Sequence, residues 1–464
     1  MEPRSLTSVV EMAGGRIISG SPATRITGVS TDSRQVRAGD LFIALPGDRF
    51  DGHDFAKNAL QNGAVALLLE KQHLADSCKS AAVAMVENTR RALGQLAARY
   101  RNDFKLPVVA VGGSNGKTTT KELIASVLRQ RFRTLQSEAS YNNDIGVPLT
   151  LLGLSLTHQA AVFEVGTNHP GELAPLVAMV QPLFSVITNI GREHLEFFES
   201  LPGVAQEEGW LAELLPAEGK LFIDGDGEWT EKIVQRTVAG VIRVGMDISN
   251  DWRASSVKVD GDGSRFRVDS PTAGLNGHYR VSLLGRHQAK NALFALAVGA
   301  ELGLGREELQ TGLADCRPPK MRLELWETGG VGVLDDCYNA NADSMRVALQ
   351  TLRDLPCKGR RVAVLGDMAE LGASSAVAHA EIGRYAAELG VAHLFAVGPL
   401  AAGLAEAARD AGLEQVQAFR DVQSATEPLK KFVAAGDLIL LKASRSMQFE
   451  RLGAALRKGI AEAG

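Results

Sequence analysis

The sequence predicts an α/β fold of three domains, with a central P-loop domain built on a parallel sheet and a Rossmann-like domain at the C-terminal end. The chain has 464 residues, more than one hydrophobic core usually holds, which corresponds to roughly three domains. Apolar runs of strand length alternate with amphipathic helical stretches, as in parallel sheets covered by helices. A glycine-rich loop, GGSNGKTTT at residues 112–120, stands between a strand-like run and a helical stretch.

Composition and charge exclude several classes of protein. Hydrophobic residues make up 45% of the chain and charged residues 22%, which is ordinary for a soluble globular protein. The formal net charge of −4 provides no basic field, so no nucleic-acid partner is expected. The N-terminal stretch MEPRSLTSVVEMAGG lacks the apolar run of a signal peptide, and no stretch approaches the ~18 apolar residues of a membrane span. We therefore expect a cytoplasmic protein without membrane insertion.

The cysteines indicate neither a metal site nor a disulfide framework. Cys78, Cys316, Cys337 and Cys357 are scattered along the chain without C-x-x-C spacing, so they are interpreted as small packing residues.

The first domain is expected to span residues 1–104. Short apolar runs, DLFIAL and AVALLLE, mix with helical stretches there, and the domain closes on an Ala/Arg-rich helix around 89–101.

The central domain is expected to span residues 105–317. LPVVAVGG is typical of a buried strand, and the amphipathic stretch KTTTKELIASVLRQRF predicts the helix after it. QAAVFEVG and LFSVITNI continue the parallel α/β pattern. Alternation of apolar and polar residues over 251–283 predicts an antiparallel patch, and HQAKNALFALAVGAEL predicts a return to helix.

The third domain, residues 318–464, shows a doubly wound pattern. GVGVLDDC, RRVAVLGD, HLFAVG and DLILLKAS are strand-like runs separated by helical segments such as ADSMRVALQTLRDL. Polar residues follow the C-terminal ends of these strands, where such sheets bind ligands. Substrates are therefore expected between the domains.

The loop at 112–120 has the parts of a phosphate site, although Val111 replaces the first glycine of the G-x-x-x-x-G-K-[ST] pattern. Its glycines allow backbone conformations and close approach that a β-carbon hinders. Lys117 can reach the β- and γ-phosphates, the Thr118 hydroxyl is placed for Mg²⁺, and the helix N-terminus favours an anion. The alternative is a glycine turn that only caps a helix. The expected ATP-binding residues of the loop are Gly112, Gly113, Ser114, Asn115, Gly116, Lys117, Thr118 and Thr119.

The loop and the motifs after it resemble those of the Mur ligases and folylpolyglutamate synthases. YNNDIGVPLTLL, FEVGTNHPGEL, NIGREHLEFF, LGRHQAKNALFAL, DDCYNANADSM, LGDMAELG and KASRSMQFE follow in the family's order. The resemblance covers nearly the whole chain. It implies a central P-loop parallel-sheet ATPase domain, an N-terminal UDP-substrate domain and a C-terminal Rossmann-like domain. It also implies a ligase that uses ATP and Mg²⁺ to activate a carboxylate as an acyl-phosphate, which an amine then attacks.

The resemblance also indicates the substrates. DDCYNAN together with GDMAELG is similar to the family members that join D-alanyl-D-alanine to UDP-N-acetylmuramoyl-tripeptide in peptidoglycan precursor synthesis. We expect these two molecules to be the partners of this protein, and the protein to be a monomer. Two alternatives remain open: a sister Mur or folylpolyglutamate-type ligase, and a nucleotide-binding paralogue that has lost ligation. The chain lacks a DNPR-like motif, which argues against the sister enzyme that adds the third peptide residue.

Four residues match the family's metal and catalytic positions besides Lys117: Thr118, Glu164, His194 and Glu208. Hard Mg²⁺ takes oxygen ligands and keeps several waters, so few protein ligands suffice. Glu164 ends an apolar strand, where its alternative is a solvated carboxylate, and the alternative for His194 is a packed core residue. Glu208 stands where many members carry a carbamylated lysine; either it supplies its own carboxylate or the second metal site is weaker.

The remaining ligand contacts are implied by the resemblance. Asn291 matches the adenine-reading asparagine, although Gln288 replaces another asparagine common in the family; Arg322 matches an arginine that reaches ATP, and Asp336 a ribose acceptor. The expected UDP contacts are Thr31, Asp32, Ser33 and Arg34, with a surface salt bridge as the alternative for Arg34. The expected residues for dipeptide binding and domain closure are Tyr338, Asn339, Asn341, Lys442, Ser444 and Arg445.

Overall fold

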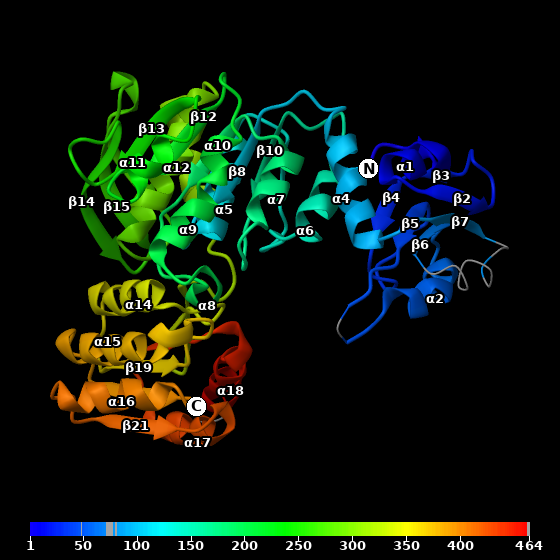
Figure 1. The fold of residues 1–464 in the computed structure, drawn as a ribbon. Coiled ribbons are helices and arrows are strands. Elements are labelled where there is room, and N and C mark those ends of the chain that lie inside the picture. The colour runs from blue at the N-terminus through cyan, green and yellow to red at the C-terminus, as the bar shows by residue number, and fades with distance from the viewer. Residues whose placement is uncertain (48, 71–77, 79–80, 462–464) are drawn as a thin grey trace.

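The computed structural model describes residues 1–47, 49–70, 78 and 81–461. Figure 1 shows three bodies: an N-terminal one in blue, a central one from cyan to green, and a C-terminal one from yellow to red. Position 48 lies outside the described residues; it falls within residues 30–56, the stretch STDSRQVRAGDLFIALPGDRFDGHDFA, whose resemblance to the family implies UDP binding. In the part of the chain that is described, no helix is long and apolar enough to cross a membrane.

The N-terminal body is built on a five-stranded sheet with the order β2-β7-β6-β5-β4. Its strands pair in parallel except β2 with β7. The buried runs that the sequence predicts as strands are β5 and β6. The elements are β1 Arg4–Ser5, α1 Leu6–Ala13, β2 Arg16–Ser19, β3 Arg25–Ile26, β4 Gly28–Ser30, β5 Asp40–Ile43, η1 Gly52–Phe55, α2 Ala56–Gln61, β6 Ala66–Leu69 and β7 Ala82–Met85.

Helix α4, Thr89–Arg101, joins this body to the next. Asn88 caps it, because its side-chain oxygen accepts a hydrogen bond from Arg91 N at 2.8 Å. Leu93 and Leu96 on its apolar face are fully buried in one hydrophobic cluster that holds residues of both the N-terminal and the central body. Figure 1 shows α4 between the two bodies, with α1 on one side and α6 and α7 on the other.

The central body holds a nine-stranded sheet with the order β16-β15-β14-β13-β12-β11-β8-β10-β9. In the order of the sheet, neighbouring strands from β9 through β10, β8, β11, β12 and β13 to β14 pair in parallel. Strands β14, β15 and β16 form the antiparallel patch predicted for 251–283. Its strands are β8 Val108–Gly112, β9 Thr134–Gln136, β10 Ala160–Glu164, β11 Phe184–Ile187, β12 Lys220–Asp224, β13 Gly240–Gly245, β14 Trp252–Asp260, β15 Gly263–Asp269 and β16 Gly277–Val281.

Helices cover both faces of this sheet, so its central strands are buried throughout. All five residues of β8 are buried, as expected for a parallel strand with two covered faces. The helices are α5 Lys117–Leu128, α6 Gly146–Leu151, α7 Leu173–Val180, α8 Leu195–Phe198, α9 Leu201–Glu208, α10 Trp210–Glu213, α11 Thr230–Val234, η2 Ala273–Leu275, α12 His287–Glu301 and α13 Arg306–Asp315.

The C-terminal body is the doubly wound unit that the sequence predicts. Its six-stranded sheet has the order β17-β18-β22-β19-β20-β21, parallel except for β17 against β18. The elements are β17 Glu324–Thr328, β18 Val331–Asp335, α14 Ala342–Asp354, β19 Arg361–Gly366, η3 Gly372–Ser374, α15 Ser375–Glu388, β20 His393–Val397, α16 Ala401–Asp410, β21 Val416–Phe419, α17 Val422–Phe432, β22 Leu438–Lys442, η4 Arg445–Met447 and α18 Glu450–Ala461.

The topology places the glycine-rich loop at a switch point of the central sheet. Strand β8 lies between β10 and β11; the chain passes from β8 to β9 and β10 on one side, and then crosses to β11 and β12 on the other. Ligands of open α/β sheets bind beyond the carboxyl ends of strands at such points. The C-terminal body faces this edge (Figure 1), where η3 packs against α8.

Candidate active site

A cavity of about 600 Å³ lies between the central and C-terminal bodies, within the size range of small-molecule sites. Residues of both bodies line it. The expected site residues among them are Ser114, Asn115, Gly116, Lys117, Thr118, Thr119, Glu164, His194, Asn291, Arg322, Asp336, Tyr338, Asn339, Asn341 and Lys442.

The loop after β8 is shaped by close backbone contacts. Gly113 has a φ of 103°, and a β-carbon there would lie 2.4 Å from Thr188 Oγ1. Gly116, with a φ of 85°, lies directly before α5, and both conformations favour glycine. The first-turn amides of α5 have no partner within the helix and point to the cavity end of the loop. Such an end binds anions such as phosphate.

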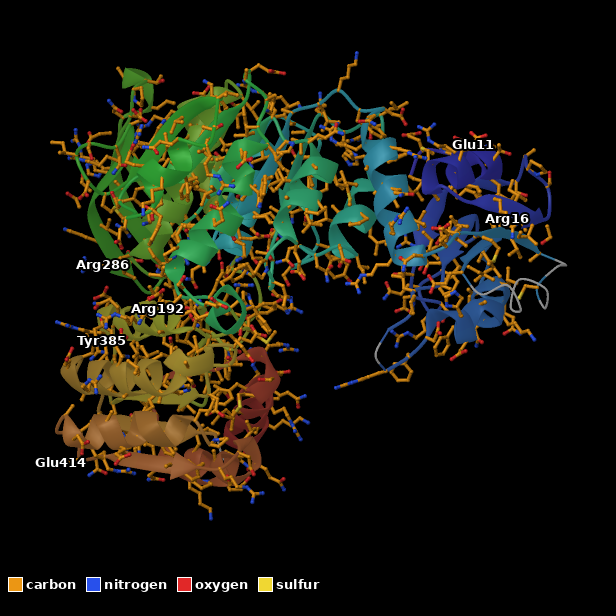
Figure 2. The ribbon with its side chains drawn as sticks, in the orientation of Figure 1. Glu11, Arg16, Arg192, Arg286, Tyr385 and Glu414 are labelled. Atoms are coloured by element: carbon orange, nitrogen blue, oxygen red, sulfur yellow. The ribbon has the colours of Figure 1, made fainter. Side chains whose placement is uncertain are left out.

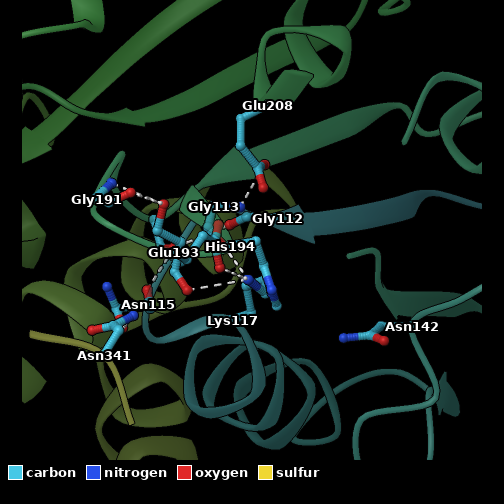
Figure 3. A network of polar contacts seen from close by, with 12 residues as sticks. Gly112, Gly113, Asn115, Lys117, Asn142, Gly191, Glu193, His194, Glu208 and Asn341 are labelled. Carbon is cyan, nitrogen blue, oxygen red and sulfur yellow. Dashed lines mark hydrogen bonds and ion pairs between the residues drawn. The ribbon is translucent and has the colours of Figure 1, made fainter. Parts of the chain in front are cut away.

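Lys117 is held by its own loop and by an acidic neighbour that the sequence did not single out. Its Nζ donates to Gly113 O, to Ser114 O at 3.1 Å and to Glu193 Oε2 at 3.1 Å (Figure 3). Burial alone lowers the pKa of Lys117, but the carboxylates of Glu193 and Glu208 outweigh it and raise the pKa above its usual value. Lys117 is therefore a cation placed at the phosphate loop.

Thr118 and Glu164 offer the oxygen ligands that a small hard cation prefers. Thr118 Oγ1 and Glu164 Oε2 are buried and have no hydrogen-bond partner among the described residues, yet both residues line the cavity. Glu164 Oε1 accepts a hydrogen bond from Asn142 Nδ2 at 2.9 Å, which orients the carboxylate. The two unpartnered oxygens fit Mg²⁺, which takes oxygen ligands and keeps part of its water shell.

The other two expected metal ligands, His194 and Glu208, do not form one ligand set with Thr118 and Glu164. Among the described residues, no three or more His, Cys, Asp and Glu side chains are arranged to hold a metal ion. His194 lines the cavity with a φ of 48°, but its Nδ1 lies 2.5 Å from Glu370 Oε2 of the C-terminal body. This contact lowers the pKa of Glu370. His194 therefore links two bodies in this arrangement.

Glu208 lies behind the phosphate loop and does not line the cavity. It is the last residue of α9, and its Oε2 accepts a hydrogen bond from Gly113 N at 2.7 Å (Figure 3). Its Oε1 is buried without a hydrogen-bond partner in the described chain. Burial raises the pKa of Glu208 to about 8. This position differs from the one expected for a metal ligand, because the short Glu208 side chain ends at the backbone of the phosphate loop.

The cavity also holds the polar groups expected for a nucleotide base, and Asn291 among them lies close to Gly116 of the phosphate loop. Asn291 Nδ2 donates to Gln288 Oε1 at 2.9 Å, and both side chains are buried. The guanidinium of Arg322 stacks 4.1 Å from the centre of the Tyr338 ring. Burial lowers the pKa of His287, another lining residue, to about 4, so this histidine is neutral at pH 7.

Several expected dipeptide and ribose residues already have protein partners. Asp336 Oδ2 lies 2.5 Å from Lys442 Nζ, which also donates to Asn339 O at 3.1 Å. Tyr338 hydroxyl contacts Ser140 Oγ across the two bodies. Asn341, at the start of α14, donates from Nδ2 to Asn115 Oδ1 at 3.0 Å.

Two expected closure residues do not line this cavity. Ser444 is buried, and its Oγ accepts a hydrogen bond from Ala369 N at 2.8 Å. Arg445 is exposed and pairs with Glu450 Oε1 at 3.2 Å. Both follow β22, at the point where the chain turns into η4.

The expected UDP contacts lie in the N-terminal body, outside this cavity. Arg34 donates from Nε to Asp32 Oδ1 at 2.9 Å and from Nη2 to Asp32 Oδ2 at 2.8 Å, with its side chain 85% exposed. This pair lowers the pKa of Asp32 to about 2. The surface salt bridge considered as the alternative for Arg34 is present. Ser33 is buried and Thr31 partly buried.

A salt-bridge cluster next to the cavity joins the central and C-terminal bodies. Arg192 donates from Nη2 to Asp343 Oδ1 at 2.7 Å and from Nη1 to Glu381 Oε2 at 2.7 Å. Its backbone N donates to Asp343 Oδ2 at 2.8 Å, and these contacts raise the pKa of Arg192. Figure 2 shows Arg192 at the boundary of the two bodies.

Sequence reasoning missed some of the residues that line the cavity. Their signal in the sequence is weak, because ordinary polar residues in loops acquire a role only when the topology brings the loops together. The missed lining residues include Ser140, Asn142, Asn168, Asn189, Glu193, His287, Lys290, Asp343 and Glu370.

The fold and the cavity define an α/β nucleotide-binding protein of the P-loop class, with its site between two domains. Three family descriptions match: "Mur ligase family, catalytic domain" over residues 25–101, "Mur ligase middle domain" over 111–299, and "Mur ligase, glutamate ligase domain" over 321–445. The chain belongs to the Mur ligase family.

Relatives and solved structures match nearly the whole chain. The UDP-N-acetylmuramoyl-tripeptide–D-alanyl-D-alanine ligase of Escherichia coli (strain K12) is 36% identical over 462 residues, 98% of each chain. A crystal structure of MurF from Acinetobacter baumannii is 32% identical, with a TM-score of 0.89 and 99% of each chain covered. MurF ligase from Thermotoga maritima in complex with ADP is 26% identical, with a TM-score of 0.82, covering 94% of this chain and 98% of that one.

Proposed function

We propose that this protein is an ATP-dependent ligase that joins D-alanyl-D-alanine to UDP-N-acetylmuramoyl-tripeptide through an acyl-phosphate, as a step in peptidoglycan precursor synthesis. The observation that carries the proposal is the cavity between the central and C-terminal bodies, in a chain 36% identical to a ligase of that name over 98% of both lengths. A phosphate loop, buried oxygen ligands and polar groups from two bodies meet in it.

The phosphate end of the cavity would support the chemical step. Lys117 and the first-turn amides of α5 would bind the β- and γ-phosphates. Thr118 and Glu164 would hold Mg²⁺, which when bound offsets the repulsion between the triphosphate and the incoming carboxylate. Lys117 would leave Glu193 and turn toward the γ-phosphate, where its charge stabilises the transferring group. The buried setting strengthens each of these interactions relative to water.

The other groups would position the substrates. Asn291 and Gln288 would bind the base, and Arg322 the nucleotide from the side of the C-terminal body. Asp336 would accept ribose hydroxyls once Lys442 releases it, and the freed ammonium would attract the carboxylate of the dipeptide. The residues Thr31, Asp32, Ser33 and Arg34 would bind the UDP portion from the N-terminal body. A monomer and a cytoplasmic location remain predictions.

A product assay tests the proposal. The protein is incubated with ATP, Mg²⁺ and UDP-muramoyl-tripeptide, with either diaminopimelate or lysine as the third residue. The amines offered separately are D-alanyl-D-alanine, D-glutamate, L-glutamate and diaminopimelate. Mass spectrometry should find an amide product with D-alanyl-D-alanine alone.

Two results would contradict the proposal. A product with glutamate or diaminopimelate would support the sister ligases, and phosphate release without any amide would support a paralogue that has lost ligation.

A further inference from the structure

Lys121 is a fully buried lysine that neither the motifs nor the proposed chemistry uses. It lies in α5, one helical turn after Lys117, with no exposed surface. A buried ammonium is costly unless all its donors are paired. Here Nζ donates to Ser137 O at 2.8 Å and to Ala139 O at 2.7 Å, and lies 2.8 Å from Glu122 Oε1. The three N–H donors of the ammonium thus have three acceptors.

Two of these acceptors belong to the loop that follows β9 and leads to the cavity. Ala139 in this loop has a φ of 45°, a conformation that residues with a β-carbon seldom adopt unless the surroundings hold them. The hydrogen bond from Lys121 to the Ala139 carbonyl provides such a restraint.

The same loop holds Glu164 at two points. Ser137 Oγ accepts a hydrogen bond from Glu164 N at 3.1 Å, and Asn142 Nδ2 donates to Glu164 Oε1 at 2.9 Å. Asn142 O also accepts from Gly166 N at 3.0 Å. Figure 3 shows Asn142 on a separate segment of the chain, across from Lys117. The contacts leave Glu164 Oε2 buried and free of hydrogen bonds from the described residues.

We propose that Lys121 is a positioning residue for the ligase reaction, which fixes the loop of residues 137–142 so that Asn142 aims the Glu164 carboxylate at the cation site. The proposal rests on the proposed function, because it takes Glu164 as a Mg²⁺ ligand. The chain of contacts runs from the Lys121 ammonium through the Ser137 and Ala139 carbonyls to Asn142 and Glu164. Lys121 itself is fully buried and does not line the cavity.

The test compares Lys121→Met, Asn142→Ala and the control Glu122→Gln with the wild type. Methionine keeps the length of the side chain without leaving a charge or donor buried. Glu122→Gln removes the ion pair but keeps both Lys121 bonds to the loop carbonyls. Three quantities are measured: hydrogen exchange of segment 137–146 without nucleotide, the Mg²⁺ concentration for half-maximal ligation, and ADP affinity in EDTA.

We expect Lys121→Met to speed exchange of segment 137–146 and to raise the half-maximal Mg²⁺ concentration about tenfold, as for lost partners of metal ligands. Asn142→Ala should raise the Mg²⁺ requirement similarly. A fourth variant that combines Lys121→Met with Asn142→Ala should raise it little further than either substitution alone, because both act through one carboxylate. ADP affinity in EDTA should change less than about twofold in every variant. Glu122→Gln should match the wild type in exchange of segment 137–146.

A folded Lys121→Met variant with wild-type exchange and wild-type Mg²⁺ dependence would overturn the proposal. If that variant does not fold, Lys121→Gln replaces it with the same outcomes, and an unchanged Mg²⁺ requirement in Asn142→Ala overturns the last link by itself. The exchange measurement needs no activity. A wild-type enzyme that fails to ligate would therefore refute the proposed function while leaving the loop restraint open to measurement.

Discussion

At the residue scale, Glu208 has two candidate roles that one substitution separates. Its Oε2 accepts the Gly113 amide at 2.7 Å, which anchors the phosphate loop, whereas a metal ligand needs the carboxylate charge. A glutamine oxygen accepts an amide hydrogen bond as well, but it is a poor substitute for a charged ligand of Mg²⁺.

We expect Glu208→Gln to keep turnover within about threefold of wild type and Glu208→Ala to lose about tenfold or more, since the latter leaves the buried Gly113 amide without an acceptor. The measurement is kcat and KM for ATP over a range of Mg²⁺ concentrations. A glutamine variant as impaired as the alanine variant, and rescued by high Mg²⁺, would restore the metal-ligand role.

The same variant has a pH signature in stability. Burial raises the pKa of Glu208 from 4.5 to about 8, so between these values the folded state binds the proton more strongly than the unfolded state. The free energy of unfolding therefore falls as pH rises through this window. Glu208→Gln has no such proton, and its advantage over wild type should grow between pH 5 and pH 9 in denaturant titrations.

Single residues were predictable where backbone spacing determines their place. Lys117 and Thr118 follow from a strand, a loop and a helix in fixed order, and Glu164 follows from the end of a neighbouring parallel strand. Ser444 and Arg445 match motif positions equally well, yet neither lines the cavity, and the chain turns into η4 after Ser444. Sequence spacing carries no information about side-chain direction in such a turn.

At the scale of elements, the loop before α8 is tied to α14 and α15 by Arg192. An isolated exposed ion pair contributes at most about 1 kcal/mol, but this guanidinium bonds two carboxylates on separate helices and is about 29% exposed. Arg192 therefore stabilises the arrangement in which the central and C-terminal bodies together enclose the cavity.

We expect Arg192→Ala to raise the KM for ATP by about tenfold, which corresponds to about 1.4 kcal/mol. Compaction on adding a non-hydrolysable ATP analogue with the UDP-peptide should also shrink in X-ray scattering. Arg286→Ala is the matched control, because Arg286 pairs with Asp354 at 2.8 Å across the same boundary but is 59% exposed. Equal effects of the two substitutions would show that Arg192 has no special role in closure.

Elements were predicted best where one pattern decided the outcome. The helix expected around 89–101 from its Ala/Arg-rich sequence is α4, Thr89–Arg101. The antiparallel patch over 251–283 is present as β14 to β16. The pairing of β17 against β18 was not foreseen, since an edge strand with partly exposed residues lacks a buried run.

At the scale of the whole molecule, the order of the three bodies follows from the sequence, but the way they join does not. The N-terminal and central bodies share one hydrophobic cluster through α4. The two clusters of the C-terminal body hold one buried residue of the central body, Leu284, and polar contacts supply much of that junction. A hydrophobic core shared by two bodies depends on how helices of both bodies pack together. The sequence pattern of each domain, taken separately, does not encode this packing.

This difference between the junctions has a consequence for how the chain melts. A cooperative unit extends as far as its apolar packing is continuous, so the N-terminal and central bodies should lose structure together, and the C-terminal body in a transition of its own. Differential scanning calorimetry of the unliganded protein should resolve two endotherms, the larger from residues before the C-terminal body. Nucleotide bound to both walls should merge them, because it links the two equilibria. A single endotherm without ligand would mean that Arg192 and its neighbours couple the bodies as firmly as α4 does.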